Sequence, residues 1–209
     1  MEIRFDQQVA ILTGAGRGLG RAHAIAMASK GAKVVVNDFS GSQEISENAN
    51  SVVEEIISAG GEAIANGANV ANFDQVQSMV NKTIDKWGRV DILVNNAGIL
   101  RDKTFLKMSV EDMREVIDVH LIGSLNCSKA VWETMREQNY GRIVLTSSSS
   151  GLYGNFGQTN YGAAKMAMLG IMNTLHLEGM KYNIKVNCLA PTAGTAMTDG
   201  LFPEPVFKL

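Results

Sequence analysis

Short apolar runs alternate with longer amphipathic stretches along the whole sequence, and this alternation constrains the fold more than any other feature. Each run has the length of a buried strand, and the stretches between carry apolar residues at helical spacing. Repeated strand–helix units form a parallel sheet covered by helices on both faces. We therefore predict a doubly wound, three-layer α/β/α fold. The predicted strands are Val9–Leu12, Lys33–Asn37, Glu62–Asn66, Asp91–Asn95, Arg142–Thr146 and Lys185–Leu189.

The two longest amphipathic stretches flank the fifth predicted strand. Apolar residues recur at helical spacing between Asp112 and Asn139 and again from Ala163 to Met180, so each stretch predicts one long helix. Residues 192–209 show no pattern of a seventh strand, and we expect the sheet to lack its last edge strand. Residues 1–209 are accordingly predicted to be a single domain that is truncated at its C-terminus.

Composition and charge exclude several classes of protein. The chain is 45% hydrophobic and 19% charged, with a formal net charge of -2 and no basic run, which argues against nucleic acid or an anionic membrane as a partner. Residues 1–8 include charged side chains and lead directly into the first strand, so we expect no signal peptide or membrane span and a cytoplasmic protein. Cys127 and Cys188 lack a CxxC pattern, which favours two buried free thiols over a disulfide or metal site.

A glycine-rich segment, Thr13 to Gly20, follows the first predicted strand and precedes a helical pattern. Glycines let the backbone approach a pyrophosphate, whose charge is stabilised by the N-terminus of the following helix. The spacing T-G-x-x-x-G-x-G resembles that of the short-chain dehydrogenase/reductase family, which implies a Rossmann-type dinucleotide-binding fold; alone, the segment would also fit a tight turn. The cofactor-binding residues predicted in this loop are Gly14, Arg17, Gly18, Leu19 and Gly20.

The choice of cofactor depends on Asp38, which follows the second predicted strand. Its carboxylate can accept hydrogen bonds from both ribose hydroxyls and would repel a 2′-phosphate. Arg17 could neutralise such a phosphate but does not remove Asp38, so the predicted cofactor is NAD rather than NADP. The family resemblance further assigns Asn69 and Val70 to the adenine ring, and the N-N-A-G residues Asn96, Ala97 and Gly98 to a close approach of the cofactor.

Tyr161 and Lys165 form a Y-x-x-x-K pattern whose i, i+4 spacing places both side chains on one helix face. A phenol has a pKa near 10, and a unit charge about 4 Å away contributes about 4 kcal/mol at an effective dielectric of 20. We therefore expect Lys165 to lower the pKa of Tyr161. The phenolate would accept an alcohol proton while the nicotinamide accepts a hydride, and no metal is required.

A run of serines ends the fifth predicted strand, and the family spacing to Gly151 and Tyr161 selects Ser148 as the residue that holds the substrate oxygen. By itself, a serine run also fits a polar loop. Most members of the resembling family carry an asparagine where this chain has His120. His120 either supports a proton-relay water in its place or is a satisfied core histidine, and the sequence leaves both readings open.

Three segments narrow the resemblance further. Residues 150–158, 190–194 and 197–198 resemble the (3R)-hydroxyacyl-CoA dehydrogenase part of type 2 peroxisomal multifunctional enzymes. This resemblance implies a 3-hydroxyacyl-CoA substrate and a homodimer joined through the two long helices, with a homotetramer as the other assembly considered. The alternatives are a 3-oxoacyl carrier-protein reductase, a general alcohol or steroid dehydrogenase, and a non-catalytic NAD-binding sensor. The complete set of Ser148, Tyr161 and Lys165 argues against the sensor.

Overall fold

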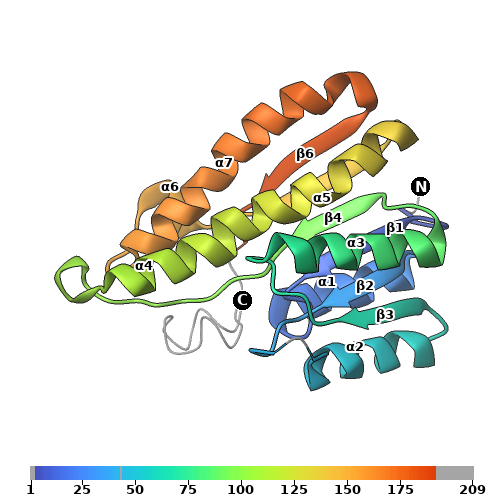
Figure 1. Ribbon diagram of the computed structural model, residues 1–209, viewed down its shortest axis with the longest axis horizontal. Coiled ribbons are helices and arrows are strands. Elements are labelled where there is room, and N and C mark those ends of the chain that lie inside the picture. The colour runs from blue at the N-terminus through green and yellow to red at the C-terminus, as the bar shows by residue number, and fades with distance from the viewer. Residues whose placement is uncertain (1–2, 43, 192–209) are drawn as a thin grey trace.

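The computed structural model describes residues 3–42 and 44–191, which contain one parallel six-stranded sheet (Figure 1). The strand order is β3-β2-β1-β4-β5-β6, so the order reverses between β1 and β4. This confirms the predicted doubly wound α/β fold, and no strand boundary differs from its prediction by more than one residue. The strands are β1 (Val9–Thr13), β2 (Lys33–Asn37), β3 (Glu62–Asn66), β4 (Ile92–Asn95), β5 (Gly141–Thr146) and β6 (Ile184–Leu189).

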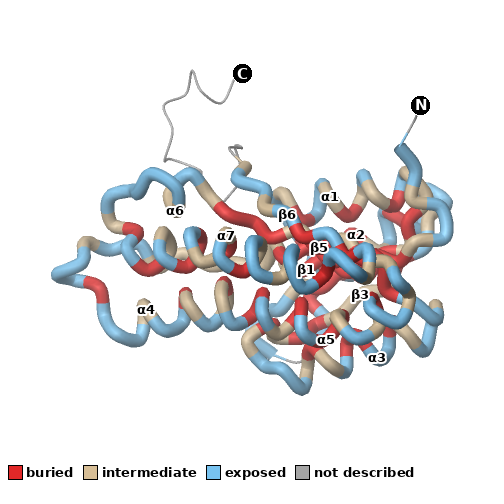
Figure 2. The backbone as a smooth tube through the Cα atoms, turned by 90° about the horizontal axis from the view of Figure 1, so that it is seen from above, coloured by how far each residue is buried: buried red, intermediate tan, exposed pale blue. Residues whose placement is uncertain are grey.

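Helices cover both faces of the sheet, with a separate hydrophobic cluster on each side. Buried side chains of α3, α5 and α7 pack on one face, and those of α1 and α2 pack on the other. Figure 2 shows the buried residues concentrated in the strands between these layers. The helices are α1 (Gly18–Ser29), α2 (Glu47–Ser58), α3 (Phe73–Trp87), α4 (Val110–Ile117), α5 (Gly123–Gln138), α6 (Ser149–Tyr153) and α7 (Thr159–Gly179).

The two long helices differ from their predictions in instructive ways. The first is not a uniform α-helix, because a π-helical turn, η2 (Asp118–Ile122), separates α4 from α5. Such turns insert one extra residue and occur frequently at functional sites. The second, α7, begins at Thr159 rather than Ala163. Polar residues form its first turn, so the apolar periodicity that marks the rest of the helix could not reveal that turn.

Some predictions are corrected here, and others fall beyond the described residues. Cys127 is a buried free thiol as predicted, but Cys188 is only half-buried because it lies near the end of the edge strand β6. The predictions of a missing edge strand and a truncated end concern residues 192–209, which lie outside the described residues. Within the described part, no helix is long and apolar enough to cross a bilayer.

Candidate active site

The carboxyl ends of β1 and β4 meet where the strand order reverses, which is the usual ligand crevice of such sheets. Two loops that leave these strands are tied together. The Asn96 side-chain amide donates to the carbonyl oxygens of Thr13 and Gly14, each at 3.0 Å. The backbone N–H groups of Asn96 and Ala97 donate to Thr13 Oγ1, also at 3.0 Å. Thr13, which the sequence analysis did not assign to the site, therefore joins the glycine loop to the β4 loop.

The glycine loop forms a cradle that side chains would fill. Gly14 and Gly18 adopt positive φ angles of 60° and 56°, a conformation that favours glycine. A Cβ atom at Gly20 would lie 2.2 Å from the Gly14 carbonyl oxygen, and one at Gly16 would lie 2.5 Å from Asp38 Oδ2. The absence of side chains at these glycines thus brings the loop backbone, the Asp38 carboxylate and the N-terminus of α1 close together. This arrangement fits a dinucleotide, with the pyrophosphate at the loop and a ribose at Asp38.

Asp38 is held in place by a residue of the next helix. Ser46 Oγ donates to Asp38 Oδ2 at 2.8 Å and accepts from Ala49 N at 3.0 Å as the N-cap of α2. A carboxylate has further lone pairs, so Asp38 retains acceptors for ribose hydroxyls. Arg17 is the exposed N-cap of α1.

Three other residues assigned to the cofactor have structural roles of their own. Asn69 Oδ1 accepts from Ala71 N at 3.0 Å, and Val70 is buried in the hydrophobic core. A Cβ atom at Gly98 would lie 2.3 Å from His120 Cε1. The glycine of N-N-A-G therefore makes room for His120, whatever its part in cofactor binding.

Ser148, Tyr161 and Lys165 come together from β5 and α7. Ser148 is the N-cap of α6, two residues after the end of β5, and its side chain lies close enough to the Tyr161 phenol to lower the pKa of that phenol. The strand end is fixed to α7, since Ser147 Oγ donates to the Lys165 carbonyl oxygen at 2.8 Å. Helix α6 packs closely on α7, where a Cβ atom at Gly151 would lie 2.7 Å from a backbone nitrogen. This close packing sets the distance between serine and tyrosine.

The electrostatics of the site correct one prediction. Lys165 is 4% exposed; its Nζ donates to the Thr146 carbonyl oxygen at 2.6 Å and lies 5.5 Å from the centroid of the Tyr161 ring. Burial lowers the pKa of Lys165 to about 7. The pKa of Tyr161 is raised, not lowered: burial raises it, the hydrogen bond with Ser148 lowers it, and the Asp102 carboxylate raises it. In the protein without cofactor the phenol is therefore less acidic than expected, because desolvation dominates and the negative charge of Asp102 adds to it.

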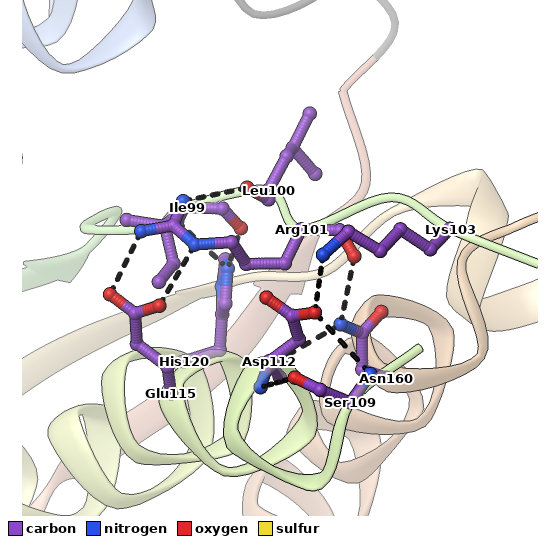
Figure 3. Close-up of polar contacts among 9 residues, drawn as sticks. All are labelled: Ile99, Leu100, Arg101, Lys103, Ser109, Asp112, Glu115, His120 and Asn160. Carbon is purple, nitrogen blue, oxygen red and sulfur yellow. Dashed lines mark hydrogen bonds and ion pairs between the residues drawn. The ribbon is translucent and has the colours of Figure 1, made fainter. Parts of the chain in front are cut away.

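His120 lies on the π-helical turn η2 and is 1% exposed. Its Nε2 lies 2.8 Å from the Ile99 carbonyl oxygen and 3.1 Å from the Ile99 nitrogen (Figure 3). Within the described residues, its buried Nδ1 has no hydrogen-bond partner. The ring meets that of Tyr161 edge-on, with 5.2 Å between centroids. His120 is therefore not a fully satisfied core histidine, and one ring nitrogen remains available.

Three polar residues near the tyrosine were missed in the sequence analysis. Asp102 follows the N-N-A-G segment, and Gln158 and Asn160 immediately precede Tyr161. Gln158 Nε2 donates to Asp102 Oδ2 at 2.6 Å, and Tyr161 N donates to Asn160 Oδ1 at 2.8 Å. Two polar side chains just before an apolar helix were the available signal, but only the structure shows that both are buried.

The family model described as short chain dehydrogenase matches residues 8–205, nearly the whole chain. The chain belongs to the short-chain dehydrogenase family. Its membership confirms the predicted family and the predicted class of enzyme, an oxidoreductase acting on CH–OH groups. In the described ranges, 3–42 and 44–191, this short-chain dehydrogenase has no group of three or more His, Cys, Asp or Glu side chains that could hold a metal ion.

Relatives of this short-chain dehydrogenase carry several names. It is 49% identical, over 99% of its length, to "Peroxisomal multifunctional enzyme type 2" of Drosophila melanogaster, of which it covers 35%. It is 47% identical, over 96% of its length, to a 3-oxoacyl-[acyl-carrier-protein] reductase of Synechocystis, of which it covers 80%. The chain thus spans about a third of the length of the multifunctional enzymes it matches.

A solved structure shares the fold closely. The 7α-hydroxysteroid dehydrogenase complexed with NADH and 7-oxo glycochenodeoxycholic acid superimposes with a TM-score of 0.89 at 32% identity. The match covers 97% of this short-chain dehydrogenase and 78% of that chain. The likeness therefore extends over both the sheet and the crevice.

Proposed function

We propose that this short-chain dehydrogenase uses NAD to interconvert a (3R)-3-hydroxyacyl-CoA and the corresponding 3-oxoacyl-CoA. The observation that carries the proposal is the close packing of α6 on α7, which brings Ser148, the N-cap of α6, near Tyr161 and Lys165 of α7. A hydroxyl and a phenol that lie close together can both reach one alcohol or ketone oxygen. Lys165 lies behind the phenol on the next turn of α7.

Each residue of this set has one task in the proposed reaction. Ser148 donates a hydrogen bond to the substrate oxygen, and Tyr161 takes its proton in oxidation or returns it in reduction. NAD, when bound, would supply the hydride acceptor and a positive charge. Because burial raises the pKa of Tyr161, positive charge nearby is needed before the phenol can act as a base. The ammonium form of Lys165 supplies such charge from within the protein.

The preference for NAD rests on Asp38. Its carboxylate lies over the glycine loop, where a 2′-phosphate would meet a like charge. The carboxylate also fits the two hydroxyls of an unmodified ribose. We further propose that the remaining assigned residues, Gly14, Arg17, Gly18, Leu19, Gly20, Asn69, Val70, Asn96, Ala97 and Gly98, line the same dinucleotide.

The substrate class is supported by the resemblance of segments 150–158 and 190–194 and by the names of the relatives. A carrier-protein thioester is the second candidate, favoured by the Synechocystis reductase that aligns over 96% of this chain. The test follows nicotinamide absorbance with NAD and NADP against both enantiomers of a short 3-hydroxyacyl-CoA, a carrier-protein thioester, a steroid and a simple alcohol. We expect turnover of the (3R)-acyl-CoA with NAD. Turnover of only a steroid or simple alcohol would remove the thioester, and NAD binding without any turnover would indicate a sensor.

The assembly proposed from the same resemblance is a homodimer joined through α5 and α7. Both helices expose apolar side chains that a partner could cover, among them Leu125 on α5 and Met166 and Leu177 on α7. Light scattering on the purified protein distinguishes a dimer from a homotetramer or a monomer.

We propose the cytoplasm as the compartment, although relatives are named peroxisomal; microscopy of a tagged full-length protein tests this.

A further inference from the structure

Residues 101–103 form a short segment, here called the strap, between the β4 loop and α4. Two ion pairs fix the strap to α4 (Figure 3). The Arg101 guanidinium binds both carboxylate oxygens of Glu115 at 2.8 and 2.9 Å, and Lys103 Nζ binds Asp112 Oδ2 at 2.7 Å. Bidentate arginine pairs restrict orientation as well as distance. The two ion pairs thus join the strap and α4 into one polar framework.

The strap also holds the segment that leads into α7. Lys103 N donates to the Gly157 carbonyl oxygen at 2.9 Å, and Gln158 Nε2 donates to the Asp102 carboxylate at 2.6 Å. Asn160 Nδ2 donates to the Arg101 carbonyl oxygen at 3.3 Å. Gln158 is 5% exposed and Asn160 is 4% exposed. Buried amides without partners are costly, so these contacts specify one arrangement of the two segments.

Asn160 occupies the central place among these contacts. Its Nδ2 lies 3.4 Å from the Asp112 carbonyl oxygen on α4, in addition to its contact with the strap. Its Oδ1 accepts from the backbone N–H of Tyr161 at 2.8 Å. The first N–H groups of a helix lack intrahelical acceptors, and the N-cap of α7 makes no side-chain cap hydrogen bond. One buried amide therefore joins the backbone of Tyr161 to both the strap and α4.

We propose that Asn160 is a positioning residue for Tyr161: its amide fixes the first turn of α7 against the strap and α4, so that the phenol stays in reach of Ser148. The proposal rests on the proposed function of Tyr161. The charged and titratable groups that face this phenol are Asp102 on the strap, Lys165 on α7 and His120 on η2. Asn160 touches none of the reacting atoms and acts through the backbone.

The test replaces Asn160 with alanine in the full-length protein, with Asn81→Ala as the matched control. Asn81 is exposed on α3, outside the site and the proposed dimer contact. We expect kcat of Asn160→Ala to fall about tenfold to hundredfold, the cost of a small misplacement of a reacting group. KM and the Kd of NAD should change by less than about twofold, because the cofactor crevice is untouched. Asn81→Ala should match the wild type.

The pH profile separates positioning from a loss of folded protein. The hydrogen bond with Ser148 lowers the pKa of Tyr161, so displacement of the phenol should move the rise of kcat/KM for oxidation to higher pH. A loss of folded protein would lower kcat/KM by the same factor at every pH and would not shift the profile along the pH axis. That result would overturn the proposal. A wild-type kcat in Asn160→Ala would overturn it as well.

A small polar variant keeps the test decisive if alanine prevents folding. Asn160→Ser keeps a hydroxyl that can accept from Tyr161 N and introduces no buried charge, but its shorter side chain cannot donate to both carbonyl oxygens. We expect a folded protein with reduced kcat, and a wild-type kcat would contradict the role of the amide. Wild-type protein inactive on every substrate would overturn the proposed function itself, whereas active wild type with unchanged variants would overturn this inference alone.

Discussion

Burial, more than charge, sets the protonation of the groups around the phenol. Burial lowers the pKa of Lys165 to about 7, and burial followed by the charge of Lys165 lowers that of His120 to about 3. Burial also raises the pKa of Tyr161. In each case desolvation disfavours the charged form. The protein without cofactor therefore has, at neutral pH, a neutral imidazole and a protonated phenol beside each other.

We predict that His120 stays uncharged between pH 5 and 8. Its Cε1–H resonance should not move over this range, and His120→Asn identifies the resonance. An unfolded chain binds a proton at this residue below about pH 6.5, whereas the folded chain does not until about pH 3. This residue's contribution to the free energy of unfolding is therefore lost as pH falls through that window, by about 1.4 kcal/mol per pH unit. A titration of the Cε1–H resonance with its midpoint near pH 6.5 would contradict the conclusion that burial keeps His120 uncharged.

The sequence predicted residues whose spacing carries information and missed those whose role depends on contacts. Tyr161, Lys165 and Ser148 were selected by spacing, and the structure places them together. Asn160 and Asp102 lie far apart in sequence, and their common role appears only when the strap packs against the start of α7. The predicted direction of the pKa shift of Tyr161 was wrong for the same reason. Neither burial nor the effect of a carboxylate that is far away in sequence can be inferred from a helical spacing.

At the scale of elements, the packing of α6 on α7 sets the distance between Ser148 and Tyr161. We predict that Gly151→Ala lowers kcat by about tenfold or more, since a misplaced reacting group loses rate steeply. The new Cβ would lie 2.7 Å from the backbone nitrogen of Met166, which cannot yield as a flexible side chain could. Initial rates together with the Kd of NAD measure the effect, and the Kd should stay unchanged.

Gly170→Ala is the matched control for this packing prediction. Gly170 lies on α7, and among the residues 3–42 and 44–191 no neighbour outside its own stretch of helix would lie within 4 Å of a Cβ atom there. The substitution should leave kcat unchanged and raise the free energy of unfolding by about 0.5–1 kcal/mol, from helix propensity. If Gly151→Ala and Gly170→Ala had the same kcat, the close packing of α6 on α7 would not control the distance between Ser148 and Tyr161.

Element boundaries were predictable where apolar patterns end sharply. Each strand is a short buried run, so its prediction differed by at most one residue. The π-helical turn η2 and the short helix α6 could not be predicted in this way, since five residues show no reliable period. The apolar pattern does not mark the first turn of α7, because Asn160 is buried there by hydrogen bonding rather than by hydrophobicity, and only the Y-x-x-x-K spacing extended the predicted helix to Tyr161.

At the scale of the whole molecule, the dinucleotide crevice spans the point where the two halves of the sheet meet. A ligand bound there by the folded state alone stabilises it by about 2.7 kcal/mol at a hundredfold excess over Kd. We therefore predict that NAD raises Tm by about 5–10 °C in a protein of this size. NADP at the same concentration should raise it less, and Asp38→Ala should diminish the difference. A larger shift with NADP would contradict the role assigned to Asp38.

The central claim is that the Tyr161 phenol transfers the proton of the substrate. The most direct measurement compares kcat and the Kd of NAD for wild type and Tyr161→Phe, which removes a single oxygen atom. The account predicts a loss of about 100-fold to 10,000-fold in kcat, or no detectable turnover, with an unchanged Kd of NAD. Turnover near the wild-type rate by a variant that still binds NAD would contradict it.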